Sequence, residues 1–184
     1  MIKLAQNRFI EEISTQKIGE EYEVKVEKHE LANGKVFNYH VLNLPNFAVI
    51  IPKLSADSYV LIKQYRPSWR RTSIGFPAGS ANGFNEDPKI TASRELEEET
   101  GYVAGQLDFI GKFRHSSRST QYCHSFVANN LTMVGQKFDE GEYIEELLEV
   151  TADQIEEFIT NGEMADISMI ATWYRYKHLN EHNY

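Results

Sequence analysis

A short acidic segment in the middle of the chain constrains the fold more than any other feature. Residues 94–101 read RELEEETG, which places four glutamates within five positions. Upstream, Asp87 followed by Pro88 is typical of a helix N-cap and of the first helical position. Gly101 is typical of the residue that follows a helix. We therefore predict a helix over 88–100 that carries the glutamates in its second half.

Three of the glutamates lie on one face of this predicted helix. Glu95, Glu98 and Glu99 are spaced i, i+3 and i+4, whereas Glu97 points elsewhere. Like charges at this spacing destabilise a helix by roughly 0.2–0.5 kcal/mol per pair, and acids near its C-terminal end oppose the helix dipole. A solvated acidic face is the usual interpretation of a charge run. Three carboxylates on one face, with Arg94 beside them, also match the hard oxygen ligands that Mg²⁺ or Mn²⁺ prefers, and we interpret the face as a metal site.

Composition limits the classes of function. A chain of 184 residues is long enough for one main domain and a small appended unit. The net charge of −8 argues against nucleic-acid binding, which needs a basic footprint, but not against a small anionic substrate, because a metal supplies positive charge locally. No segment is apolar for long enough to span a bilayer, the first residues show no apolar stretch typical of a signal peptide, and the single Cys123 cannot form an intrachain disulfide. We expect a cytoplasmic protein without nucleic-acid or membrane partners.

The first 45 residues are predicted to form a small antiparallel β unit. Residues 22–31 begin with apolar and charged residues in alternation, which is the period of a half-buried strand. Asn33-Gly34 is a hairpin turn signal, and residues 35–44 follow as the returning strand. We expect a separate unit over 1–45 and a catalytic domain over 46–184.

The rest of the chain interleaves strands with helices. Apolar or alternating segments predict strands at about 47–54, 58–66, 107–114, 123–132 and 144–151. The segment 77–88 is predicted to be a loop because proline and glycine are frequent at its start. Thr151 and Gln154 form a capping box before a second helix, and a last helix is expected over about 166–180. This order indicates a layered α/β domain with a mixed sheet.

The acidic segment and its flanks resemble the Nudix box, the signature of hydrolases that cut nucleoside diphosphates linked to another moiety. The matching residues are Glu86, Arg94, Glu95, Leu96, Glu98, Glu99, Gly101 and Tyr102. The glycine that opens the family's box corresponds here to Ser80, and the nearest glycine is Gly79. The resemblance implies an α/β/α sandwich.

The resemblance extends to the ADP-ribose pyrophosphatase branch of that family. Residues 63–79, KQYRPSWRRTSIGFPAG, are similar to the branch's lead-in to the box, although Gly75 stands where the branch usually has an acidic residue. Residues 139–146 and 161–178 are similar to its acidic loop and closing helix. The resemblance implies hydrolysis of the pyrophosphate bond of ADP-ribose or a related nucleoside diphosphate sugar, giving a nucleoside monophosphate and a sugar phosphate.

The resemblance also implies roles for single residues. Two or more Mg²⁺ ions, or Mn²⁺, are expected on Ala78 (through its backbone carbonyl), Glu95, Glu98, Glu99 and Glu142. Glu140 or Glu142 on the acidic loop is the expected general base, and the residues alone do not decide between them. Arg94 and Glu98 are counted with the catalytic residues, and Arg94 and Glu86 are expected to orient the metal ligands.

Four residues are candidates for substrate binding. Arg66 follows a predicted strand, and its guanidinium suits a phosphate. Trp69, Phe37 and Tyr39 are candidates to stack on the nucleobase, although an aromatic residue at strand spacing is more often part of a core.

Two alternative functions remain open. The alternatives are a non-catalytic nucleotide-sugar sensor of the same family and a hydrolase of another nucleotide such as GDP-mannose.

The amino-terminal unit is too small to bury both of its apolar faces, because two-stranded units are marginal in water. Enzymes of the resembled branch are homodimers in which this region helps to complete the neighbour's nucleotide pocket, so we expect a homodimer.

Overall fold

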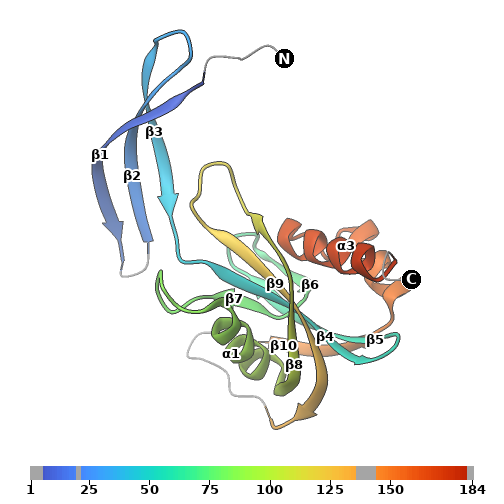
Figure 1. Cartoon of the computed structure of the whole chain (residues 1–184). Helices are drawn as coiled ribbons and strands as arrows, with labels where there is room; N and C mark the ends of the chain where they lie inside the picture. Colours follow the sequence, from blue (N-terminus) through green and yellow to red (C-terminus); the bar gives the residue numbers. More distant parts are fainter. Residues whose placement is uncertain (1–5, 20–21, 136–143, 182–184) are drawn as a thin grey trace. The chain divides into compact units, whose positions relative to one another are not determined.

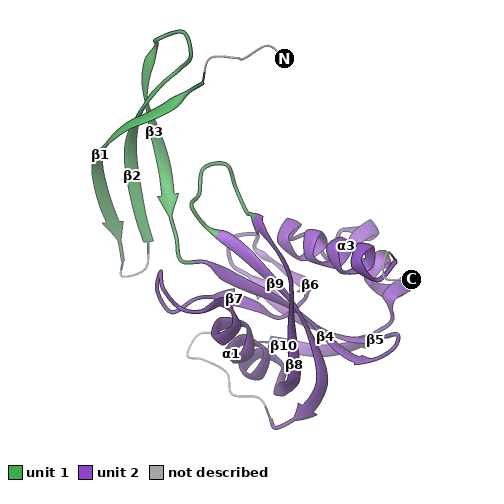
Figure 2. Ribbon diagram, viewed as in Figure 1, with its two compact units in different colours: residues 1–45, 114–121 green, residues 46–113, 122–184 purple. Residues whose placement is uncertain are grey.

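The computed structural model describes residues 6–19, 22–135 and 144–181, and its elements are labelled in Figure 1. The chain divides into two compact units, shown in Figure 2. Unit 1 consists of residues 1–45 and 114–121, and unit 2 consists of residues 46–113 and 122–184.

Unit 1 is built on a three-stranded antiparallel sheet in the order β1-β2-β3. Its strands are β1 (Arg8–Ile18), β2 (Tyr22–Glu30) and β3 (Val36–Asn43). The turn between β2 and β3 contains Gly34 with φ +84°, a conformation that glycine adopts at low cost. The hairpin expected from the Asn-Gly pair is therefore present.

Strand β1 was not expected as an element, and its irregular pairing explains why. Its register with β2 shifts between Phe9 and Glu11 and again between Glu12 and Ser14. Each shift interrupts the alternation of side chains between the two faces, so the strand has no clean period of two in its sequence.

The segment 114–121 belongs to unit 1 through backbone hydrogen bonds to the end of β3. The Leu42 N–H donates to the Arg118 carbonyl at 2.7 Å, and the Thr120 N–H donates to the Leu42 carbonyl at 2.9 Å. Unit 1 is thus assembled from two stretches that are distant in the sequence.

Unit 2 contains a seven-stranded mixed sheet with the central order β10-β5-β4-β9-β8. Its strands are β4 (Phe47–Ser55), β5 (Ser58–Arg66), β6 (Arg71–Gly75), β7 (Ala78–Ser80), β8 (Tyr102–Arg114), β9 (Tyr122–Met133) and β10 (Ile144–Val150). β4 and β9 are parallel, whereas β5 is antiparallel to β4, β6 and β10. The short β7 pairs with β4, so the prediction of a loop throughout 77–88 was wrong at its start.

Helices cover both faces of this sheet, as Figure 1 shows. They are α1 (Pro88–Thr100), α2 (Ala152–Asn161) and α3 (Ile167–Glu181). Alternate residues of β4 face opposite layers: Ala48 and Ile50 pack in a cluster with Leu96 of α1. Val49 packs in the other cluster, which contains Trp173 of α3. The predicted α/β/α sandwich with a mixed sheet and an antiparallel amino-terminal unit is confirmed.

The ends of the first two helices follow the predicted capping chemistry. The Asp87 side chain accepts a hydrogen bond from the Lys89 N–H at 2.8 Å, and Gly101 has φ 73° after the last turn of α1. Thr151 and Gln154 form the reciprocal capping box of α2. These caps fix where α1 begins and ends, and hence where its glutamates lie.

None of the helices in the described part of the chain is long and apolar enough to cross a membrane.

Candidate active site

Two of the α1 glutamates are buried. Glu95 is 3% exposed and Glu99 is 1% exposed, and the side chain of Glu98 is 18% exposed. A buried carboxylate is costly unless charge or hydrogen bonds compensate it. The solvated acidic face is therefore not what the structure shows for Glu95 and Glu99.

Arg94 supplies positive charge to this face. Its Nη1 donates to Glu95 Oε1 at 2.7 Å and to Glu98 Oε2 at 2.9 Å. Its Nη2 donates to the Ser80 carbonyl at 2.7 Å. Burial acts to lower the pKa of Arg94, but the two carboxylates outweigh it and raise that pKa, so the guanidinium stays charged.

Glu86 joins the preceding loop to α1. One oxygen, Oε2, accepts from the Asn82 N–H at 2.9 Å and from the Thr91 hydroxyl at 2.7 Å, and lies 3.7 Å from Arg94 Nη2. Burial acts to raise the pKa of Glu86, whereas the two hydrogen bonds and Arg94 outweigh it and lower that pKa. Glu86 therefore stays ionised at neutral pH and holds the loop through these contacts.

The strand β7 lies directly against the carboxylates. The Ala78 N–H donates to Glu99 Oε2 at 2.7 Å. A Cβ atom on Gly79 would lie only 2.1 to 2.2 Å from the Glu95 carboxylate, so position 79 has no room for a side chain. The structure thus brings together Ala78, Glu95, Glu98 and Glu99, the four described residues that were predicted to bind metal.

The donor chemistry of this group fits a divalent cation. Carboxylates are the hard oxygen ligands of Mg²⁺ and Mn²⁺. Over residues 6–19, 22–135 and 144–181, however, no three His, Cys, Asp or Glu side chains are grouped closely enough to hold a metal ion as they lie. The charge that now faces Glu95 and Glu98 is the Arg94 guanidinium.

The predicted general base falls outside this description. Glu140 and Glu142 lie in the segment 136–143, which is outside the described residues. Their roles stay predictions.

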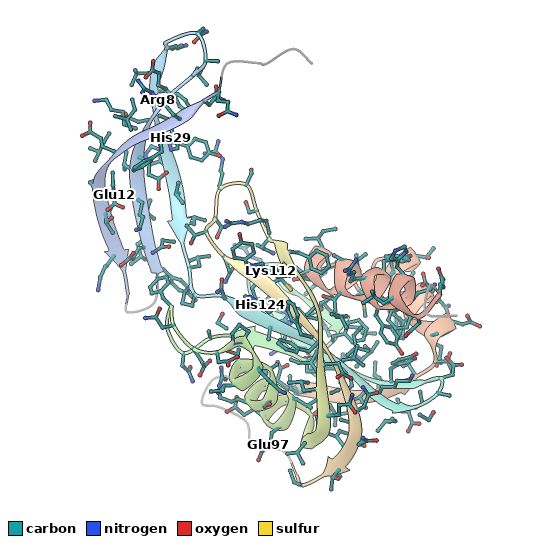
Figure 3. All side chains as sticks on the ribbon, in the orientation of Figure 1. Arg8, Glu12, His29, Glu97, Lys112 and His124 are labelled. Atoms are coloured by element: carbon teal, nitrogen blue, oxygen red, sulfur yellow. The ribbon has the colours of Figure 1, made fainter. Side chains whose placement is uncertain are left out.

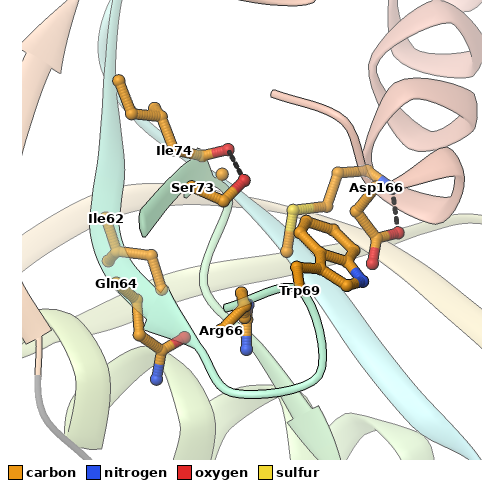
Figure 4. Close-up of a pocket in the computed structure, with 9 residues that line it drawn as sticks. Ile62, Gln64, Arg66, Trp69, Ser73, Ile74 and Asp166 are labelled. Carbon is orange, nitrogen blue, oxygen red and sulfur yellow. Dashed lines mark hydrogen bonds between the residues drawn. The ribbon is translucent and has the colours of Figure 1, made fainter. Parts of the chain in front are cut away.

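Arg66 and Trp69 line a narrow cleft in unit 2, shown in Figure 4. Arg66 ends β5, and Trp69 lies in the turn before β6. The other lining residues are Ile62, Gln64, Ser73, Ile74, Gly75, Asp166 and Met169. A Cβ atom on Gly75 would lie 2.3 Å from Met169 Sδ, so Met169 fills the space that a side chain at position 75 would need.

Phe37 and Tyr39 belong to an aromatic cluster in unit 1. The His29 ring, labelled in Figure 3, lies 5.9 Å from the Phe37 ring and 6.0 Å from the Tyr39 ring. The Arg118 guanidinium lies over the Tyr39 ring at 5.2 Å. Both aromatic residues therefore have protein neighbours, and their stacking on a nucleobase stays a prediction.

Sequence reasoning missed three contributors to these sites. Ser80 acts through its backbone carbonyl, which carries no sequence signal. Gln64 is 8% exposed and lies among residues of β5, β6 and α3 that line the cleft. Met169 reaches Gly75 from another element. A polar residue within the apolar strand 58–66 was the only available signal for Gln64.

Comparisons with known proteins find a matching family model, related sequences and a solved structure with the same fold. The family model described as NUDIX domain matches residues 44–173. The ADP-ribose pyrophosphatase of Bacillus subtilis (strain 168) is 32% identical over 151 residues, 80% of each chain. The methanol dehydrogenase activator of Bacillus methanolicus is 30% identical over 159 residues, 84% of this chain and 85% of that protein. The crystal structure of an ADP compounds hydrolase superposes with a TM-score of 0.82 at 19% identity, covering 98% of this chain and 97% of the other, which shows a shared fold.

Proposed function

This chain belongs to the NUDIX domain family, and on that premise we propose that it is a metal-dependent pyrophosphohydrolase of ADP-ribose or a related nucleoside diphosphate sugar. The products are a nucleoside monophosphate and a sugar phosphate. The observation that carries the proposal is the pair of buried glutamates, Glu95 and Glu99, which α1 holds against Ala78 and Gly79. The name of the Bacillus subtilis relative supports the substrate class.

The metal ions are assigned to the carboxylate face of α1. Glu95, Glu98, Glu99 and the backbone carbonyl of Ala78 would hold two or more Mg²⁺ or Mn²⁺ ions, with Glu142 as a further ligand. When bound, the ions supply positive charge that polarises phosphoryl oxygens and makes water a stronger acid. The burial of Glu95 and Glu99 supports this assignment, because both carboxylates lie in a setting that favours a strong counter-charge.

Arg94 and Glu86 position the carboxylates in this proposal. Arg94 holds the Glu95 and Glu98 carboxylates by direct hydrogen bonds and is itself tied to the Ser80 carbonyl. Glu86 ties the loop before α1 to the first turn of the helix through Thr91. Ligands that are held in this way lose little freedom when a cation binds.

Other candidate residues are assigned to substrate binding and to proton transfer. Arg66 is assigned to a phosphate group, since a guanidinium forms paired hydrogen bonds with phosphate oxygens. Trp69, Phe37 and Tyr39 are the candidates to stack on the nucleobase. Glu140 or Glu142 is assigned as the base that takes the proton from the attacking water.

We propose that the protein works as a homodimer in the cytoplasm, with residues 1–45 as the dimerisation unit and 46–184 as the catalytic domain. Every residue of β1 is exposed. The large apolar residues of unit 1 that are 40% to 55% exposed are Phe9, Ile10, Ile13, Ile18, Tyr22, Val36 and Leu42. So much exposed apolar surface on a small sheet is typical of an interaction surface.

A panel of nucleoside diphosphate sugars tests the proposed function. Each is incubated with the protein and Mg²⁺, and release of nucleoside monophosphate is measured. We expect ADP-ribose, or another panel member such as GDP-mannose, to be cut in a strictly metal-dependent way. A protein that binds a panel member without cutting it would instead be the non-catalytic sensor.

A further inference from the structure

Gln64 is a buried polar residue with an unsatisfied acceptor. Its side chain is 8% exposed, and its Oε1 has no hydrogen-bond partner among the described residues. Leaving a buried acceptor unpaired lowers the stability of a fold, so such groups in folded proteins call for an explanation. Figure 4 shows the Gln64 amide within the cleft that Arg66 and Trp69 also line.

Its polar neighbours in the cleft are satisfied by the protein. The Ser73 hydroxyl, on the strand paired with β5, donates to the Glu163 carbonyl at 2.9 Å. Asp166 Oδ1 accepts from the Ser168 N–H at 2.8 Å at the start of α3. The unpaired oxygen of Gln64 therefore does not follow from a general shortage of partners in this region.

A water molecule is not the missing partner of the Gln64 oxygen either. The cleft is too narrow in this structure to admit a water molecule. A buried water also needs room and two or more polar partners. A group that reaches Gln64 must therefore displace part of the wall, and Trp69 is the part that we expect to move. It lies on the turn between β5 and β6 and is 39% exposed.

The charges around the cleft indicate what kind of donor fits. Oε1 accepts hydrogen bonds, so the missing partner must carry an O–H or N–H group. The Arg66 guanidinium, two residues along the strand, disfavours an ammonium group and favours an anion beside the donor. A neutral hydroxyl next to a phosphate meets both conditions.

We propose that Gln64 is a specificity-determining residue that accepts a hydrogen bond from a hydroxyl of the substrate's terminal sugar, the one that is not part of the nucleoside, while Arg66 contacts the adjoining phosphate. The proposal rests on the function proposed above and deepens it. It assigns the recognition of the sugar to a side chain of β5, and it makes displacement of the Trp69 indole a part of binding. A site that pairs a buried amide with a hydroxyl discriminates strongly against a ligand that lacks the hydroxyl.

Gln64→Met tests the proposal, since methionine has a similar length and no acceptor of comparable strength. The wild type and the variant are compared on two substrates: the panel's fastest nucleoside diphosphate sugar, and the pentyl ester of the same nucleoside diphosphate, which lacks the hydroxyls of the terminal sugar and keeps those of the nucleoside. We expect kcat/KM for the sugar substrate to fall roughly 10-fold, as for loss of one neutral hydrogen bond in a buried site. For the pentyl ester we expect kcat/KM to stay within about 2-fold.

Thermal unfolding of the variants separates recognition from a structural role. Gln64→Met should keep or raise Tm, because it removes an unsatisfied buried oxygen. Gln121 is the matched control, since its Nε2 donates to the Pro45 carbonyl at 2.7 Å, and Gln121→Met should lower Tm. A lower Tm for Gln64→Met with an equal loss on both substrates would mean that Gln64 is structural, and the proposal would be wrong. An unchanged kcat/KM for both substrates would also overturn it.

Failure of the proposed function has a different signature. A wild-type protein that cuts no member of the panel removes the premise before any variant is measured. A wild type that cuts the sugar substrate, together with a variant that cuts it equally well, contradicts only the role of Gln64.

Discussion

A Cβ atom on Gly79 would lie 2.1 Å from Cδ of Glu95, so the glutamate carboxylate occupies the space where a side chain at position 79 would begin. This contact ties the geometry of β7 to that of the carboxylate face. Any side chain at position 79 must displace either the strand or Glu95, and neither can move without disturbing the proposed metal ligands.

Gly79→Ala is therefore expected to reduce activity far more than the addition of one methyl group suggests. A displacement of about 1 Å at a catalytic group costs on the order of 10²-fold in rate, and we expect a loss of that order in kcat. Ser80→Ala is the matched control, because only the Ser80 backbone carbonyl contacts Arg94. Steady-state kinetics of both variants at saturating Mg²⁺ measures the difference. Equal activity of Gly79→Ala and the wild type would show that Glu95 need not lie where the structure places it.

The two acidic-loop glutamates should differ in their effects. We expect Glu140→Gln or Glu142→Gln to lower kcat by roughly 10²–10⁴, the usual loss for a general base. The other variant should lose less, and added metal should partly restore it if that residue is a ligand. Both are measured as kcat across a Mg²⁺ titration. Two nearly silent variants would place the base elsewhere, most simply on α1.

The proposed dimer depends on the exposed apolar side chains of unit 1. Ile13 on β1 is 49% exposed, and Ile13→Lys should shift the protein towards a monomer because a charge in an apolar interface is costly. Ile90→Lys is the control, since Ile90 is 59% exposed but lies in unit 2. Light scattering at micromolar concentration measures the mass. A wild-type chain that stays at 21.2 kDa with full activity would rule out both the dimer and a pocket shared between protomers.

Acid should weaken the anchor that Glu86 provides. The pKa of Glu86 in the folded protein lies below its ordinary value of 4.5, mainly because hydrogen bonds from Thr91 and Asn82 outweigh burial. A lowered pKa means that the carboxylate stabilises the fold above pH 4.5, and that this contribution is lost as pH falls through the folded-state pKa.

The stability difference between wild type and Glu86→Gln should follow this titration. We expect the wild type to unfold at a higher urea concentration than the variant at pH 7, and the difference to shrink as the pH falls below 4.5 and through the folded-state pKa. Urea unfolding at a series of pH values measures it. A difference that stays constant with pH would mean that the charge of Glu86 contributes nothing.

The sequence was informative where local chemistry decides the structure. The caps at Asp87 and Gly101 defined α1, and the spacing of Glu95 and Glu99 placed both carboxylates on one face. It was uninformative where partners come from distant segments. Strand β1 was missed because two register shifts break its alternation, and β7 because three residues are too few to show a period.

The contacts between the residues that line the cleft were also beyond prediction from the sequence alone. Gln64 lines its cleft together with Ser73 of β6 and Met169 of α3, and a single strand's sequence does not reveal these neighbours. The role of Gly75 was equally hidden, because the atom that fills its side-chain space belongs to Met169, more than ninety residues later. Contacts of this kind become visible only when the chain is folded.

Turnover of ADP-ribose by Glu99→Gln, with and without Mg²⁺, tests the central claim most directly. The amide can still accept the hydrogen bond from the Ala78 N–H, so the fold and Tm should be kept or improved, while the charge that would hold a metal ion is lost. Glu97→Gln is the control, because helical spacing places Glu97 off the face that Glu95, Glu98 and Glu99 share. We predict Mg²⁺-dependent release of nucleoside monophosphate by the wild type and by Glu97→Gln, and none above background by Glu99→Gln. Wild-type activity in Glu99→Gln at saturating Mg²⁺ would contradict the assignment of the α1 carboxylates as the metal site.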